Sequence, residues 1–146
     1  MATIININAD QQTTSNALDD LHHYFADDLS QVEATLSAHL SSAASLIPEV
    51  CDHIIGAGGK RLRPLLTLSA ARIAGYRGNH HITMAAAVEF MHTATLLHDD
   101  VVDDSDLRRG KPTARNIWGN PTSVLVGDFL LGQAFRIMVG AGTVSY

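Results

Sequence analysis

The chain is organised around residues 96–111, which read Leu96-Leu97-His98-Asp99-Asp100-Val101-Val102-Asp103-Asp104-Ser105-Asp106-Leu107-Arg108-Arg109-Gly110-Lys111. Five acids come first and three bases follow, and an apolar segment leads into the acids. Like charges one helical turn apart repel each other unless a counter-charge is supplied. A hard divalent cation binds carboxylate oxygens and would supply that charge. The stretch therefore predicts a cation site at the end of a buried helix.

The composition favours helices over a sheet. Hydrophobic residues make up 46% of the 146 residues and aromatic residues only 5%, with Ala, Leu, Ile and Val supplying most of the apolar content. That length is enough for one domain with a hydrophobic core. We therefore expect an all-α domain.

The cysteine content and the apolar runs indicate which cellular compartment the protein suits. Cys51 is the only cysteine, which excludes an intramolecular disulfide framework and a cysteine-based zinc site. A reducing, cytoplasmic location is the expectation. No uninterrupted apolar run reaches the roughly eighteen residues of a membrane span, so we expect no transmembrane segment. We also expect no targeting segment at the N-terminus, which lacks a basic stretch followed by an apolar run.

Charge is segregated along the chain although the formal net charge is only −5. Residues 1–59 contain no Lys or Arg, whereas the segment between Asp52 and Glu89 contains bases and no acid. This segment should attract anions. Its bases are too few, and too poor in neighbouring aromatic residues, for a nucleic-acid surface, so a small polyanion fits better.

Helical periodicity divides the first half of the chain. Residues 1 to about 28 are polar and acidic and are predicted to be mobile or weakly helical. Apolar spacing from Leu29 predicts a helix to about Ala44. Pro48 opens another, which the glycines of Gly56-Ala57-Gly58-Gly59 end. The basic run Lys60-Arg61-Leu62-Arg63-Pro64 then precedes a helix from Leu65 to about Ala74. Bases at a helix N-terminus suit phosphate, although a glycine cap followed by solvated bases explains the same residues.

A long helix, from about His81 through Leu97 and on to Asp104, is apolar nearly all round and belongs in the middle of a bundle. At about 100° per residue, His92, Asp99 and Asp103 fall within roughly 40° of one another, with Thr95 close by. Asp100 and Asp104 point elsewhere. This stripe predicts a polar cavity inside the bundle.

Each of these groups also has a simpler interpretation. His92 is as well explained as a hydrogen-bonded core histidine, and the acids as a solvated helix end. Acids are, however, unfavourable near a helix C-terminus, which weakens that interpretation. The bases Arg108, Arg109 and Lys111 could simply neutralise the preceding acids through surface pairs.

Beyond Gly110 the sequence predicts a short helix from Pro112 to Trp118 and an apolar helix from Ser123 to about Val139 that contains Asp128. Gly119-Asn120-Pro121 separates the two. Residues 140–146 form a tail with two glycines.

Taken together, the motifs resemble those of the trans-polyprenyl diphosphate synthases, and most closely the octaprenyl and related long-chain synthases of bacterial quinone biosynthesis. The resemblance covers about Leu29 to Met138. It is carried by three segments in the family's order and spacing: Gly58-Gly59-Lys60-Arg61-Leu62-Arg63-Pro64, residues 89–110 with their Asp-Asp-Val-Val-Asp core, and Val126-Gly127-Asp128.

The resemblance implies a partial isoprenoid-synthase helical bundle, with residues 29–139 forming its N-terminal half. It assigns Asp99 and Asp103 as ligands of Mg²⁺ on an allylic diphosphate such as farnesyl diphosphate, and Arg108 as a grip on that diphosphate. It assigns Lys60, Arg63 and Arg109, with His92 beside them, to isopentenyl diphosphate. It also implies a homodimer in full-length members.

The reaction that the resemblance implies is the head-to-tail (1'-4) condensation of these two substrates to a long-chain all-trans polyprenyl diphosphate. Charge on the departing diphosphate is stabilised, and the isopentenyl double bond attacks the allylic carbocation. The residues before the first aspartate, Ala94 and Thr95, are small, which in this family is typical of an open product channel and a long chain.

Residues 1–146 do not include the second Asp-rich motif of the family or its later helices. We therefore expect this truncated chain to have little or no prenyltransferase activity by itself. The alternative is a non-catalytic helical remnant that packs against an intact synthase subunit through its unpaired helices.

Overall fold

The structure, a computed structural model, describes residues 7–41, 44–55 and 59–142. These residues form seven helices and one short β-hairpin, which confirms the predicted all-α class. Residues 56–58 of the predicted glycine-rich loop, residues 1–6 of the lead-in and residues 143–146 of the tail lie outside the described residues. The elements are α1 (Ile7–Tyr24), α2 (Ala26–Leu40), α3 (Leu46–Ile55), α4 (Leu62–Ile73), α5 (His80–Val102), β1 (Leu107–Arg108), β2 (Lys111–Pro112), α6 (Ala114–Trp118) and α7 (Asn120–Ala141).

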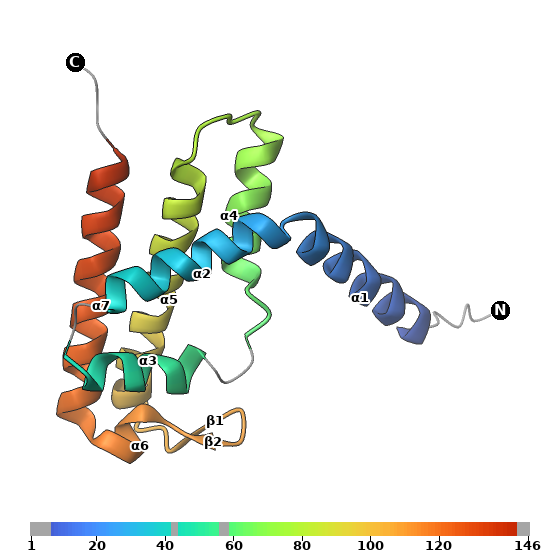
Figure 1. The fold of residues 1–146 in the computed structure, drawn as a ribbon. Helices are drawn as coiled ribbons and strands as arrows, with labels where there is room; N and C mark the ends of the chain where they lie inside the picture. The colour runs from blue at the N-terminus through green and yellow to red at the C-terminus, as the bar shows by residue number, and fades with distance from the viewer. Residues whose placement is uncertain (1–6, 42–43, 56–58, 143–146) are drawn as a thin grey trace.

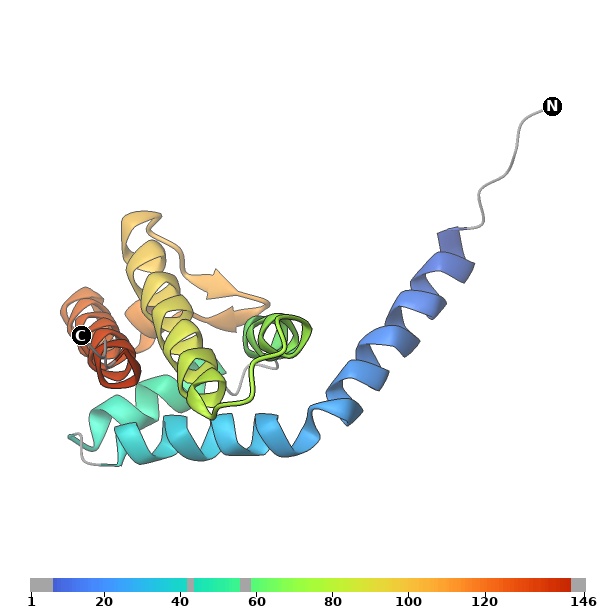
Figure 2. The ribbon, with the colours of Figure 1, turned by 90° about the horizontal axis from the view of Figure 1, so that it is seen from above.

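Helix α5 is the centre of the fold, as its apolar pattern predicts. It packs against α7 on one side and α4 on the other, and α2 crosses these helices on one face (Figures 1 and 2). Helix α3 and the hairpin lie together at the end where α5 finishes (Figure 1). The acidic end of α5 therefore lies near α3, which is distant in sequence, and near the hairpin that follows α5.

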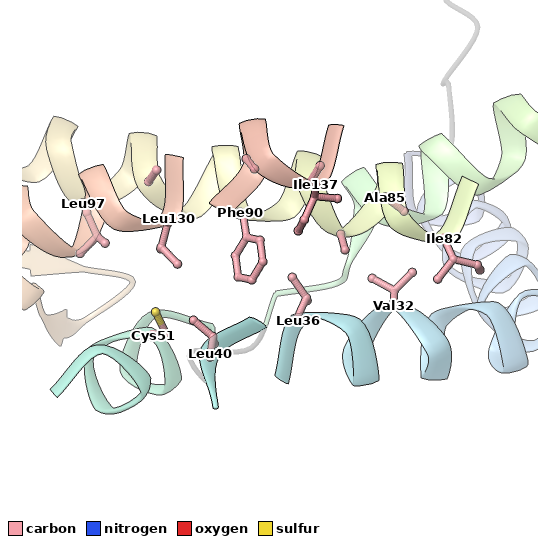
Figure 3. Close-up of a cluster of buried hydrophobic side chains, with 14 of the residues drawn as sticks. Val32, Leu36, Leu40, Cys51, Ile82, Ala85, Phe90, Leu97, Leu130 and Ile137 are labelled. Carbon is pink, nitrogen blue, oxygen red and sulfur yellow. The ribbon is translucent and has the colours of Figure 1, made fainter. Parts of the chain in front are cut away.

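The hydrophobic core lies between α2 and the layer formed by α5 and α7. Val32 and Leu36 of α2 point toward Phe90 and Ala85 of α5 and Ile137 of α7 (Figure 3). Phe90 is completely buried, and Ala85, Ala86 and Ala87 let the neighbouring helices approach closely. Burial of each of the larger side chains contributes about 1.5–3 kcal/mol to the stability of the fold. This packing fixes the direction of α5 and hence the position of its acids.

The N-terminal segment is more helical than its sequence predicts. Helix α1 runs unbroken for 18 residues and extends away from the body of the molecule (Figure 2). Its last residue, Tyr24, lies edge-on to Phe25 at 4.8 Å and beneath the guanidinium of Arg72 at 5.8 Å. These contacts join the base of α1 to the bundle, and periodicity in the polar lead-in gives little sign of them.

Helix α7 is the one helix among the described residues that is long and apolar enough to cross a membrane, judged by length and composition. Core helices of folded proteins pass the same test, so this carries little weight against the expectation of no transmembrane segment. One face of α7 packs on α5, whereas Leu125, Phe135 and Val139 on its other faces are more than half exposed.

The hairpin corrects the prediction for the segment that follows α5. The sequence predicts a short helix beginning at Pro112, but β1 and β2 pair first, with Leu107 opposite Pro112 and Arg108 opposite Lys111. The helix, α6, begins only at Ala114. Arg109 and Gly110 between the strands have φ angles of 50° and 75°, as a tight type I′ turn requires. Strands of two residues have no detectable period, and Arg-Gly is a weaker turn signal than Asn-Gly, so the sequence did not reveal them.

Candidate functional site

A cavity of about 320 Å³ lies between α3, α5 and the hairpin. Four arginines and a histidine line it, against a single carboxylate, that of Glu89. The cavity therefore has an excess of positive charge and suits a small polyanion. The charged and titratable lining residues are Arg61, Arg63, Glu89, His92, Arg108 and Arg109.

Four of the residues predicted to bind diphosphate meet in this cavity. Arg63 comes from the first turn of α4, His92 from the middle of α5, and Arg108 and Arg109 from the hairpin. Lys60, which the resemblance also assigns here, is exposed and does not line the cavity. Three segments far apart in the sequence thus bring their bases to one place.

Arg61 is a cavity residue that the sequence did not single out. Its backbone is left-handed, with φ of 50°, at the residue preceding α4. Its guanidinium forms ion pairs with Glu33 of α2 and, at 3.2 Å, with Glu89 of α5. The two acids lie on different helices, and nothing in the spacing of the sequence relates them to Arg61. These pairs tie the basic loop to the bundle.

Burial and neighbouring charges shift two of the lining groups. Burial raises the pKa of Glu89 above its ordinary value, although the Arg61 guanidinium opposes that shift. The pKa of His92 is lowered, first by burial and then by the positive charges of Arg63, Arg108 and Arg109. His92 is therefore neutral near pH 7 and can donate one N–H to an anion without adding charge.

The acids at the end of α5 have different environments. Asp100 is only 2% exposed, and its two oxygens accept hydrogen bonds from Nη2 of Arg108 at 2.6 Å and Nε at 3.3 Å. Asp104 and Asp106, in the following loop, both pair with Arg115. Asp99 and Asp103 lie outside these pairs, on the exposed face of α5. The helical wheel correctly separated Asp99 and Asp103 from Asp100, but the sequence did not identify Arg115.

The exposed stripe corrects the prediction of an enclosed cavity. Thr95, Asp99 and Asp103 are open to solvent, and only His92 is partly enclosed. The two small residues before the acids lie in different environments. Ala94 is buried in the core, whereas Thr95 is exposed on the same face as Asp99 and Asp103. A channel along this face would therefore pass Thr95 rather than Ala94.

Asp99 and Asp103 suit a magnesium ion that a phosphate group completes. Over the described residues, no group of three or more His, Cys, Asp or Glu side chains is close enough to hold a metal ion by itself. Mg²⁺ is, however, usually bound through one or two carboxylates together with substrate phosphates and water. The two exposed carboxylates, one helical turn apart, match that donor set.

The segment Val126-Gly127-Asp128 holds the acidic end of α5 against α7. His98 of α5 lies with its Nε2 3.2 Å from the carbonyl oxygen of Val124 and 3.2 Å from a carboxylate oxygen of Asp128. Gly127 makes room for this ring, because a Cβ at that position would lie 2.3 Å from Nε2. Ser123 donates a hydrogen bond to the carbonyl of Leu97 at 3.0 Å nearby. A side chain at this position would displace the His98 ring from the place it occupies between the two helices.

Comparison with known proteins gives a consistent result. Residues 44–145 match the family described as polyprenyl synthetase. The chain is 49% identical over 127 residues to octaprenyl diphosphate synthase of Escherichia coli (strain K12), covering 87% of this chain and 39% of that protein. It is 47% identical over 115 residues to all-trans-nonaprenyl-diphosphate synthase (geranyl-diphosphate specific) of Rhodobacter capsulatus, covering 78% and 35%.

Solved structures share the fold. A decaprenyl diphosphate synthase from Rhodobacter capsulatus superposes with a TM-score of 0.82 at 54% identity, over 86% of this chain and 39% of that one. A polyprenyl synthase from Caulobacter crescentus CB15, complexed with calcium and isoprenyl diphosphate, gives a TM-score of 0.80 at 53% identity over 84% and 38%. The chain thus spans about two fifths of the length of these relatives.

The lowered pKa of His92 predicts a pH dependence of stability. Because the pKa of His92 is lower in the folded chain, the folded chain takes up this proton at a lower pH than the unfolded chain, which takes it up as the pH falls through about 6.5. The free energy of unfolding should therefore decrease below that pH and not change from this cause above it. Denaturant unfolding at pH 7.5 and 5.5 should show a smaller decrease for His92→Gln than for the wild type. An equal decrease in both proteins would contradict the shift.

A pair of glycines on α7 tests the contact between the two helices. Gly132→Ala meets open space and should stabilise the helix by about 0.5–1 kcal/mol. Gly127→Ala gains the same helix propensity but displaces His98, so its free energy of unfolding should fall at least about 1 kcal/mol below that of Gly132→Ala. Chemical denaturation measures both variants. Equal stabilisation by the two substitutions would show that His98 moves away without cost.

Proposed function

The chain belongs to the polyprenyl synthetase family, and on that premise we propose that its protein is a prenyltransferase that joins isopentenyl diphosphate to an allylic diphosphate. The product we propose is a long-chain all-trans polyprenyl diphosphate, as the names of the octaprenyl, nonaprenyl and decaprenyl relatives suggest. The observation that carries the proposal is the basic cavity beside the two exposed aspartates of α5.

The cavity is the proposed site of the diphosphate of isopentenyl diphosphate. Arg63 and Arg109 would bind its oxygens as charge-assisted hydrogen-bond donors, with neutral His92 adding one N–H. Lys60, exposed at the entrance to α4, would have to reorient to join them. The apolar Ile54, Ile55 and Leu96 in the same lining suit the hydrocarbon part of this substrate.

The proposed site of the allylic diphosphate is the exposed face of α5. Asp99 and Asp103 would hold Mg²⁺ there, and Arg108 lies at the border between this face and the cavity. The bond to Asp100 raises the pKa of Arg108 and keeps the guanidinium charged and oriented. The related Caulobacter structure, which contains calcium and isoprenyl diphosphate, supports a site of this chemistry.

In the proposed reaction the carbon–oxygen bond of the allylic diphosphate breaks, and its electron pair leaves with the diphosphate. A bound Mg²⁺ supplies positive charge that stabilises this leaving group. Arg108 adds a fixed positive charge beside it. Arg63, Arg109 and His92 hold the isopentenyl diphosphate so that its double bond forms the new carbon–carbon bond, and proton loss restores an alkene. These residues contribute electrostatics and positioning, so no nucleophilic side chain is needed.

We also propose that the protein works in the cytoplasm and as a homodimer. The single, buried Cys51 is consistent with a reducing compartment. The exposed apolar residues of α7, Leu125, Phe135 and Val139, are consistent with a partner surface.

Binding of inorganic pyrophosphate, measured by calorimetry with and without Mg²⁺, tests the site in this chain. Arg63→Ala or Arg109→Ala should weaken binding about tenfold or more, since a hydrogen bond to a charged group contributes roughly 1.5–3 kcal/mol. Asp99→Asn with Asp103→Asn should remove the gain in affinity that Mg²⁺ provides. Arg136→Ala on α7 and Asp27→Asn on α2 are charge-matched controls at exposed positions and should bind as the wild type does.

Activity is tested by grafting, because the chain spans only about two fifths of its relatives. Residues of this chain replace the matching segment of the Escherichia coli octaprenyl synthase, and elongation of farnesyl diphosphate with labelled isopentenyl diphosphate is measured. The chimera should elongate, and the double aspartate variant should lose about 100-fold or more. A folded chimera without activity, together with a wild-type chain that does not bind pyrophosphate, would contradict the proposal.

A second candidate is a non-catalytic helical module that packs against an intact synthase subunit. The exposed apolar side chains of α7 favour it. Mixing the purified chain with that same octaprenyl synthase distinguishes the two when complex formation and pyrophosphate binding are both measured. The module predicts a stable mixed complex by size-exclusion chromatography, weakened by Phe135→Asp, in a chain that does not bind pyrophosphate. The enzyme predicts pyrophosphate binding whether or not the subunit is added.

A further inference from the structure

The hairpin that carries Arg108 and Arg109 cannot hold its own shape. Each of its strands is two residues long, and Leu107, Gly110, Lys111 and Pro112 are exposed. An isolated two-stranded hairpin is at best marginally stable in water. The position of the two arginines therefore depends on contacts between the hairpin and the helices around it.

The base of the hairpin is closed by local contacts. The backbone N–H of Thr113 donates to the carbonyl of Asp106 at 2.9 Å, and its hydroxyl donates to the carbonyl of Ser105 at 2.7 Å. Arg115 donates to the same Ser105 carbonyl at 3.1 Å. Toward α5, Arg108 is held by Asp100. These contacts fix the base and the first strand, whereas the exposed second strand is tied to the first by their two-residue pairing.

His53 of α3 holds that second strand. Its Nε2 lies 2.7 Å from the carbonyl oxygen of Pro112, a contact between residues 59 positions apart. Because a carbonyl only accepts, Nε2 carries the proton and donates it, as it does in both the Nε2–H tautomer and the imidazolium. The ring is fixed edge-on against Trp118 of α6, with centroids 5.4 Å apart and an angle of 79° between the planes.

The hydrogen bond between His53 and Pro112 lies close to the arginines of the cavity. Pro112 is paired with Leu107, the neighbour of Arg108, across the ribbon. His53, Asp100 and Arg108 line one small cavity of about 20 Å³, so the histidine lies beside the buried ion pair. The next residues of α3, Ile54 and Ile55, line the diphosphate cavity itself. Helix α3 thus lines the cavity through Ile54 and Ile55 and contacts, through His53, the hairpin that carries two of the cavity's arginines.

We propose that His53 is a positioning residue, which sets the place of Arg108 and Arg109 by holding the carbonyl of Pro112. The inference rests on the proposed function, because it assigns His53 to the diphosphate site. His53 touches no substrate in this role. His53 restricts the motion of the hairpin before the anion binds. Removing His53 should therefore lower the affinity for the anion more than it lowers the free energy of unfolding.

The test compares His53→Phe with His53→Gln in the 146-residue chain. Phenylalanine keeps the ring against Trp118 but has no donor, whereas the glutamine amide keeps an N–H donor. His39→Phe is the matched control, since His39 contacts a backbone carbonyl, that of Thr35, at 2.8 Å and lies edge-on to Phe90, away from the hairpin. The measurements are amide hydrogen exchange of residues 105–113 and the affinity for inorganic pyrophosphate.

We expect faster exchange in residues 105–113 and roughly 3- to 10-fold weaker pyrophosphate binding for His53→Phe, the range of one lost neutral hydrogen bond. His53→Gln should recover most of both, and His39→Phe should change neither. Wild-type exchange and affinity in His53→Phe, no recovery by glutamine, or an equal loss in His39→Phe would each overturn the inference. If the wild type does not bind pyrophosphate, the proposed function fails instead, and the exchange data alone decide whether His53 holds the hairpin.

Discussion

The ion pair between Asp100 and Arg108 is the interaction on which the site depends. A carboxylate that is 2% exposed must be paired and hydrogen-bonded, because an isolated buried charge is costly. The core packing of α5 directs Asp100 inward, and the partner has to come from outside the helix. The chain supplies it by turning back through the hairpin. A requirement of folding therefore brings Arg108, and Arg109 with it, to the wall of the cavity.

Ion pairs with Arg108 and Arg115 explain why five neighbouring acids do not form a repulsive surface. Each acid is assigned an environment by the geometry of the chain. Asp100 faces inward to Arg108, while Asp104 and Asp106 in the loop share Arg115. Asp99 and Asp103 remain on the exposed face. Arg108 and Arg115, which follow the acids in sequence, thus neutralise three of the five acids. The other two, Asp99 and Asp103, remain available to a cation.

The sequence predicted the parts of this arrangement that depend on local periodicity. The 3.6-residue repeat located α5 and α7 to within a few residues, and the helical wheel separated Asp99 and Asp103 from the buried Asp100. It did not predict contacts between distant segments. The Arg61 pairs with Glu33 and Glu89, the His53 bond to Pro112 and the exclusion of Lys60 from the cavity all depend on how helices pack. The hairpin was missed for a different reason, because strands of two residues are too short to have a pattern.

Backbone strain at the cavity follows from the same constraint. Three non-glycine residues among those described have positive φ angles, and two of them, Arg61 and Arg109, line the cavity. A left-handed residue with a side chain costs of order 1–3 kcal/mol and persists only where its surroundings enforce it. For Arg61 the two glutamates enforce it, and for Arg109 the paired strands do. Arg109 lies in the turn of the hairpin, and Arg61 immediately precedes α4, so both left-handed residues lie where the chain changes from one element to the next. The strain is thus located where the chain concentrates positive charge, and the core of α2, α5 and α7 provides the stability that offsets it.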